Sequence, residues 1–87
     1  MDPFIKKIQQ ICTIDDAVAE LNFQIKLTPK LNEIIQFCID AHKGQFRKSG
    51  EPYIVHPILV ASITAHFSND EDIVATALLN IYLNHHL

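Results

Sequence analysis

Apolar residues recur every three or four positions along most of the chain, which is the spacing of an amphipathic helix. No stretch shows the strict alternation of apolar and polar residues that is typical of a half-buried strand. The pattern therefore predicts an all-α protein of about five helices joined by short connections. The periodic stretches are residues 4–12, 14–25, 31–42, 58–67 and 73–82.

Polar residues that cap helices precede these stretches. For the fourth helix we expect His56 at the N-cap and Pro57 at the first helical position, because a residue before proline is disfavoured in the α conformation. For the last helix, Ser68 and Glu71 have the spacing of a capping box. The first three helices are expected to begin after Asp2, Thr13 and Thr28.

Residues 42–57 form the longest stretch without helical periodicity, and they contain both glycines of the chain. Lys43, Arg47 and Lys48 outnumber the one acid, Glu51, so this predicted loop has a local surplus of positive charge. Such a patch suits phosphate groups, and a guanidinium group also stacks on a purine. The alternative is an ordinary solvated surface loop, since charged loops are common.

Length and charge exclude several classes of protein. A chain of 87 residues forms one domain at most, and its formal charge of −3 lacks the basic excess of a protein that wraps DNA or RNA. No apolar run approaches the ~20 residues needed to span a bilayer, and the N-terminus lacks the apolar segment of a secretory signal. We expect a cytoplasmic protein without nucleic-acid or membrane partners.

Cysteine and histidine offer little for a metal site when they are considered alone. Cys12 and Cys38 occupy apolar positions of predicted helices, so both are expected to be buried and reduced. A metal site needs about three protein ligands, and His56 has no second ligand at a familiar spacing. His85 and His86 are adjacent, so on a helix they point in different directions.

The loop and the segments after it carry a resemblance to a known family. Residues 41–57 read AHKGQFRKSGEPYIVHP, residues 69–72 read NDED, and residues 77–79 read ALL. Together they resemble the opening signature of the RelA/SpoT family, the bifunctional ppGpp synthetase/hydrolases. The resemblance is good over residues 31–79 and weak over residues 1–30. It implies the N-terminal part of the helical fold of an HD-domain phosphohydrolase.

The family's HD-type module binds Mn²⁺ and removes the 3′-pyrophosphate of ppGpp and pppGpp. By this resemblance, His56 matches the first metal ligand of the family. Arg47, Lys48 and Ser49 match the residues that hold the guanine nucleotide, with Arg47 against the base.

The resemblance stops after residue 79. The family continues there with a His-Asp pair of metal ligands and, one turn later, with a Glu-Asp pair that acts on the attacking water. This chain has Asn80 and Ile81, then Asn84 and His85. Because hydrolysis needs a metal to activate water, we expect no catalytic residue, no retained Mn²⁺ and no ppGpp hydrolysis by this chain.

These observations predict a single, incomplete HD-type domain over residues 1–87, with residues 80–87 unlike the family. We expect a truncated reading frame, a disrupted gene or part of a longer protein. Three functions stay open: the inactive N-terminal part of a ppGpp hydrolase, a nucleotide-binding or regulatory fragment without turnover, and a small helical interaction module. The last would self-associate through exposed apolar faces of the helices over residues 58–67 and 73–82.

Overall fold

The regular secondary structure is all α-helical in the part of the chain that the structure describes. The computed structural model describes the backbone of residues 2–86 and the side chains of residues 2–80. Within this part there is no strand, only one isolated β-bridge. The prediction of an all-α protein with five helices is therefore confirmed. The helices are α1 (Pro3–Gln10), α2 (Ile14–Gln24), α3 (Pro29–Ala41), α4 (Val55–Phe67) and α5 (Glu71–His86).

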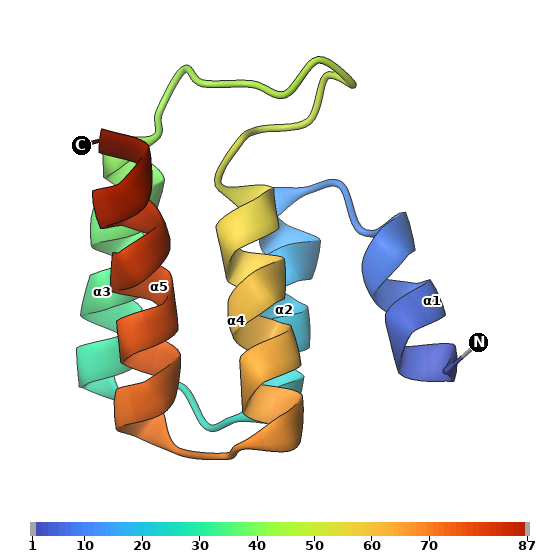
Figure 1. Cartoon of the computed structure of the whole chain (residues 1–87), viewed down its shortest axis with the longest axis vertical. Helices are drawn as coiled ribbons and strands as arrows, with labels where there is room; N and C mark the ends of the chain where they lie inside the picture. Colours follow the sequence, from blue (N-terminus) through green and yellow to red (C-terminus); the bar gives the residue numbers. More distant parts are fainter. Residues whose placement is uncertain (1, 87) are drawn as a thin grey trace.

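Four helices form the body of the protein, and α1 lies at one side of it (Figure 1). Helix α4 packs against both α2 and α5, and α3 packs against α5. Each of these four helices contributes a side chain that is 0% exposed, namely Leu21, Leu31, Ile58 and Leu78. The connection between α3 and α4 runs across one end of the body.

The expected caps of the first three helices are present. The side-chain oxygen of Asp2 accepts a hydrogen bond from the Phe4 N–H at 2.8 Å. The Thr13 hydroxyl oxygen likewise accepts from the N–H of Asp16, and the Thr28 hydroxyl oxygen from the N–H of Leu31. Each bond satisfies a backbone donor that the first turn of a helix leaves without a partner.

The predicted start of the fourth helix was wrong. Helix α4 begins at Val55, so His56 lies inside its first turn, and Ile54 at the N-cap already has helical dihedral angles. Two interactions explain the earlier start: the Val55 N–H donates to the Pro52 carbonyl at 3.1 Å, and both Ile54 and Val55 are buried. Pro57 is tolerated because the first turn needs no partner for its missing N–H.

The predicted cap of the last helix was also wrong. Asp70, and not Ser68, caps α5: its side-chain oxygen accepts from the N–H groups of Asp72 and Ile73 at 2.9 and 3.2 Å. Ser68 is still bound to the preceding helix, because its N–H donates to the last turn of α4. The capping-box spacing therefore did not decide where α5 begins.

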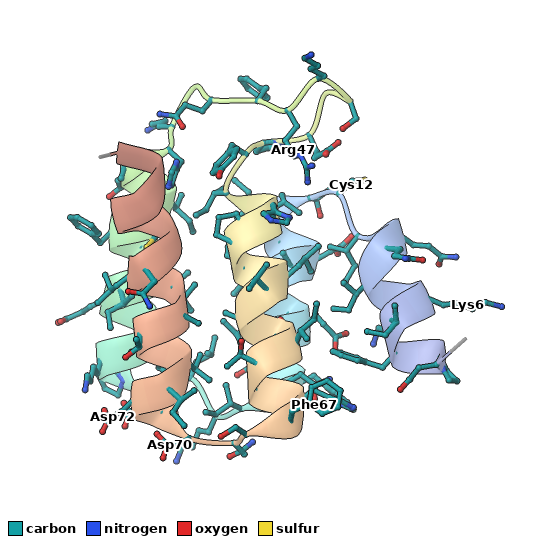
Figure 2. The ribbon with its side chains drawn as sticks, in the orientation of Figure 1. Lys6, Cys12, Arg47, Phe67, Asp70 and Asp72 are labelled. Carbon is teal, nitrogen blue, oxygen red and sulfur yellow. The ribbon has the colours of Figure 1, made fainter. Side chains whose placement is uncertain are left out.

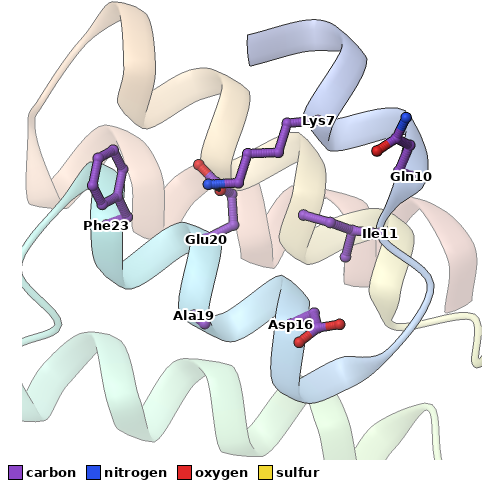
Figure 3. Close-up of a pocket in the computed structure, with 7 residues that line it drawn as sticks. All are labelled: Lys7, Gln10, Ile11, Asp16, Ala19, Glu20 and Phe23. Carbon is purple, nitrogen blue, oxygen red and sulfur yellow. Dashed lines mark ion pairs between the residues drawn. The ribbon is translucent and has the colours of Figure 1, made fainter. Parts of the chain in front are cut away.

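An ion pair between an exposed lysine and a buried glutamate joins α1 to the body of the protein (Figure 3). The Lys7 ammonium lies 2.8 Å from a carboxylate oxygen of Glu20, which is buried on α2. The other oxygen of Glu20 accepts from the Gln24 amide at 2.7 Å. The rings of Phe4 and His66 stack with centroids 4.0 Å apart, which ties α1 to α4 as well.

The surroundings of Glu20 favour its ionised form. Burial alone would raise the pKa of Glu20, but hydrogen bonds from Lys7 and Gln24, and the charges of Lys7 and His66, outweigh it and lower the pKa. A carboxyl group whose pKa is lower in the folded state stabilises the fold above its unfolded pKa. That stabilisation is lost as the pH falls through the folded pKa.

The substitution Glu20→Gln tests this ion pair. We expect it to lower the free energy of unfolding at pH 7 by about 1–2 kcal/mol, since it removes a charged, hydrogen-bonded partner from a buried position. The difference from the wild type should shrink as the pH falls below 4.5, the ordinary pKa of glutamate. Urea unfolding across this pH range measures the difference in the free energy of unfolding. Glu33→Gln, on an exposed glutamate of α3, is the matched control and should change little. A loss of unfolding free energy in Glu20→Gln that does not depend on pH would contradict this role of the ion pair.

Candidate functional site

The connection between α3 and α4 contains a tight hairpin, residues 46–52. The Arg47 N–H donates to the Glu51 carbonyl at 2.9 Å, and the Gly50 N–H donates to the Arg47 carbonyl at 2.8 Å. Phe46 and Pro52 form an antiparallel bridge at its base. Gly50 has a φ of +104°, a conformation that favours glycine. The hairpin therefore holds the backbone of Arg47 in a defined position.

The side chain of Arg47 reaches from the hairpin towards the start of α4 (Figure 2). Its Nη1 lies 3.4 Å from Nδ1 of His56. Its Nε lies 3.7 Å from a carboxylate oxygen of Glu51, which also accepts from the Ser49 hydroxyl at 2.7 Å. The hydrogen bond from Ser49 is the main cause that lowers the pKa of Glu51. Arg47 thus lies between an imidazole and an ionised carboxylate.

The surroundings of His56 favour the neutral form of its imidazole. Partial burial lowers the pKa of His56, and the positive charge of Arg47 lowers it further. A neutral imidazole is the form that binds metals or accepts a proton. Here, however, its Nδ1 faces a guanidinium group.

A cavity of about 300 Å³ lies beside Arg47 and His56. The hairpin, the first three turns of α4, and α1 with the residue that follows it all contribute to the lining. Most of its wall is aliphatic, and only four of its side chains are polar. The polar ones are Gln9, Arg47, Glu51 and His56, and the aliphatic ones include Ile8, Ile11, Leu59 and Ile63.

No family model matches this chain, and no solved structure matches it. Over 41 residues, 47% of this chain, it is 61% identical to the guanosine-3′,5′-bis(diphosphate) 3′-pyrophosphohydrolase of Haemophilus influenzae. Over a segment of the same length it is 54% identical to the bifunctional (p)ppGpp synthase/hydrolase SpoT of Escherichia coli. A putative GTP diphosphokinase of rice, the chloroplastic RSH1, is 38% identical over 61 residues, 70% of this chain.

The identity to these relatives shows the family of the matched part of the chain. The matched segment belongs to the RelA/SpoT family. The chain spans about 6% of the length of these RelA/SpoT relatives. Its all-α architecture is consistent with a helical fragment of an HD domain, as the resemblance implied.

Among the described side chains, the surroundings of His56 do not supply the ligands of the metal that the RelA/SpoT resemblance implies. In the part of the chain with described side chains, no three His, Cys, Asp or Glu residues lie together as a metal site would require. Asn80, which stands where the family has a histidine, is exposed. The side chains of Ile81 and of the residues from Asn84 to His86 lie outside the described residues.

Of the four residues predicted from the RelA/SpoT signature, two line the cavity and two do not. Arg47 and His56 lie together and line the cavity. Lys48 is exposed at the turn of the hairpin and is not among the lining residues, and Ser49 bonds to Glu51. Gln9 lines the cavity without having been predicted, because nothing in the periodicity or the family signature distinguishes it from other surface glutamines.

The two cysteines differ from the prediction that both are buried. Cys38 is buried, and burial raises the pKa of its thiol. Cys12 is exposed (Figure 2). Helix α1 ends at Gln10, so Cys12 lies in the connection to α2 and not on an apolar helix face.

None of the described helices combines the length and the apolar composition that a membrane crossing requires.

Proposed function

We propose that this chain binds a guanine nucleotide of the ppGpp type at Arg47, in the cytoplasm, and does not hydrolyse it. One observation carries the proposal: Arg47 lies at a cavity, fixed by the hairpin, with its guanidinium group 3.4 Å from His56. An arginine in such a position stacks on a base or binds a phosphate group. The Haemophilus influenzae relative is named for its action on guanosine-3′,5′-bis(diphosphate), which supports this class of ligand.

Lys48 and Ser49 complete the proposed nucleotide site from the outer side of the hairpin. Lys48 supplies a second positive charge there. The Ser49 hydroxyl, now bonded to Glu51, is available to a phosphate group if that bond is exchanged. In this proposal the phosphate groups lie against the hairpin, where water and cationic side chains compensate their charge.

The absence of turnover follows from the chemistry of the reaction. Cleavage of a pyrophosphate group at neutral pH needs a metal to lower the pKa of the attacking water. Among the residues that line the cavity, one imidazole is present, that of His56, and its Nδ1 is directed at the positive charge of Arg47. We therefore assign His56 as the remnant of a metal site, without retained Mn²⁺ and without catalytic residues.

Arg47→Ala tests nucleotide binding. We expect the dissociation constant for ppGpp, measured by calorimetric titration, to rise about tenfold or more, because charged hydrogen bonds and stacking are lost. Lys26→Ala, on an exposed lysine that does not line the cavity, is the control and should bind as the wild type does.

The same samples test turnover. With Mn²⁺ added, the wild type should release no pyrophosphate from ppGpp. Two results contradict the proposal: a wild type that gives no heat with ppGpp, or an Arg47→Ala variant that binds equally well. Release of pyrophosphate would contradict only the absence of turnover.

Exposed aromatic residues favour a second candidate function, self-association. Phe67 on α4 is 75% exposed and Phe23 on α2 is 78% exposed. Ile73, on α5, is also exposed. Large exposed apolar side chains mark contacts between proteins where they gather in one patch.

Sedimentation velocity tests this candidate. If the chain self-associates through α4, its average mass should rise with concentration, and Phe67→Asp should remove that dependence because a buried charge disfavours the contact. Phe46→Asp, on an exposed phenylalanine of the hairpin, serves as the control. A wild type that stays monomeric at all concentrations would exclude self-association.

A further inference from the structure

Helix α1 forms one wall of the cavity beside Arg47. Ile8 and Gln9 lie on this helix and Ile11 directly follows it, and all three line the cavity. The helix belongs to the first 30 residues, which resemble RelA/SpoT proteins only weakly. The wall is therefore a feature of this chain's own structure and not of the signature around Arg47.

The cavity suits a flat, uncharged ring better than a phosphate group. Its one cation, Arg47, lies 3.7 Å from the carboxylate of Glu51, so their charges largely cancel. The remaining wall is mostly aliphatic, with Leu59 and Ile63 on the α4 side. Burying a phosphate group against aliphatic side chains costs free energy that a purine ring does not incur.

Gln9 has a free amide at the edge of this cavity. It is exposed, and among the described residues its side chain makes no hydrogen bond. An amide both donates and accepts, so it pairs with the edge of a purine that carries a donor next to an acceptor. Guanine has such an edge, with its N1–H beside its O6.

We propose that α1 is part of the nucleotide site and that Gln9 hydrogen-bonds the edge of the guanine base. The base enters the cavity between α1 and α4, with Arg47 against one face of the ring. This inference rests on the proposed function, and it adds a contact from a helix outside the family signature. The Lys7–Glu20 ion pair holds α1 in the position that this contact requires.

The next residue of the same helix provides a matched control. Gln10 is also exposed, but it lines a different cavity together with Lys7, Glu20 and Phe23 (Figure 3). Successive residues of a helix point about 100° apart, which is why two neighbouring glutamines face different cavities. If these substitutions disturb α1 in general, both variants should bind ppGpp more weakly than the wild type. If Gln9 contacts the base, only the substitution of Gln9 should weaken binding.

The experiment is a calorimetric titration of ppGpp into the wild type, Gln9→Ala and Gln10→Ala. We expect Gln9→Ala to raise the dissociation constant about fivefold, because the paired neutral hydrogen bonds of an exposed amide are lost, and Gln10→Ala to change it less than twofold. The factor by which Gln9→Ala raises the dissociation constant should be the same at low and high salt, since salt screens charges but not a neutral hydrogen bond. Circular dichroism should show equal helix content in all three proteins.

The outcomes separate this inference from the proposed function. If Arg47→Ala weakens binding but Gln9→Ala does not, the nucleotide site stands and α1 is not part of it. Equal losses in Gln9→Ala and Gln10→Ala would also overturn the inference. A wild type that does not bind ppGpp would overturn both proposals.

Discussion

The burial of α4 holds the body of the protein together. This helix packs between α2 and α5, and its side chains are apolar nearly all around. Ile58 and Ala61 are fully buried, and even Ser62 is enclosed, with its hydroxyl bonded to the Ile58 carbonyl at 3.2 Å. Because α4 is packed on both α2 and α5, its first turn holds the backbone of His56 in place. The hairpin that enters this turn fixes Arg47 in the same way.

At the start of α4, two groups contact the guanidinium group of Arg47. Glu51 attracts its guanidinium group, and Nδ1 of His56 lies 3.4 Å from its Nη1. An anionic ligand would have to displace or share these partners, while a ring placed against the guanidinium plane would not. This difference leads us to place the base in the cavity and the phosphate groups against the outer side of the hairpin.

Much of the fold could be predicted from the sequence, because helical periodicity and three caps are local signals. The starts of α4 and α5 could not, because they depend on contacts outside the local pattern. At α4, the burial of Ile54 and Val55 extends the helix before its proline, and at α5 the chain remains bonded to α4 through Ser68. Local propensity yields to tertiary packing at both ends.

The candidate site was predicted in part for a similar reason. Arg47 and His56 lie in one continuous signature, so the sequence already placed them close together. The contribution of Gln9 depends on where α1 packs, and this follows from the ion pair between Lys7 and the buried Glu20. No spacing along the chain indicates that contact.

We propose that α1, the hairpin and the start of α4 form one nucleotide site. Amide chemical shifts of the nitrogen-15-labelled protein, recorded during addition of ppGpp, test this proposal. We expect saturable shifts in residues 8–11, 46–51 and 55–60, with α3 and the first turns of α5 unchanged. Shifts confined to α3 and α5, or no shifts at all, would contradict it.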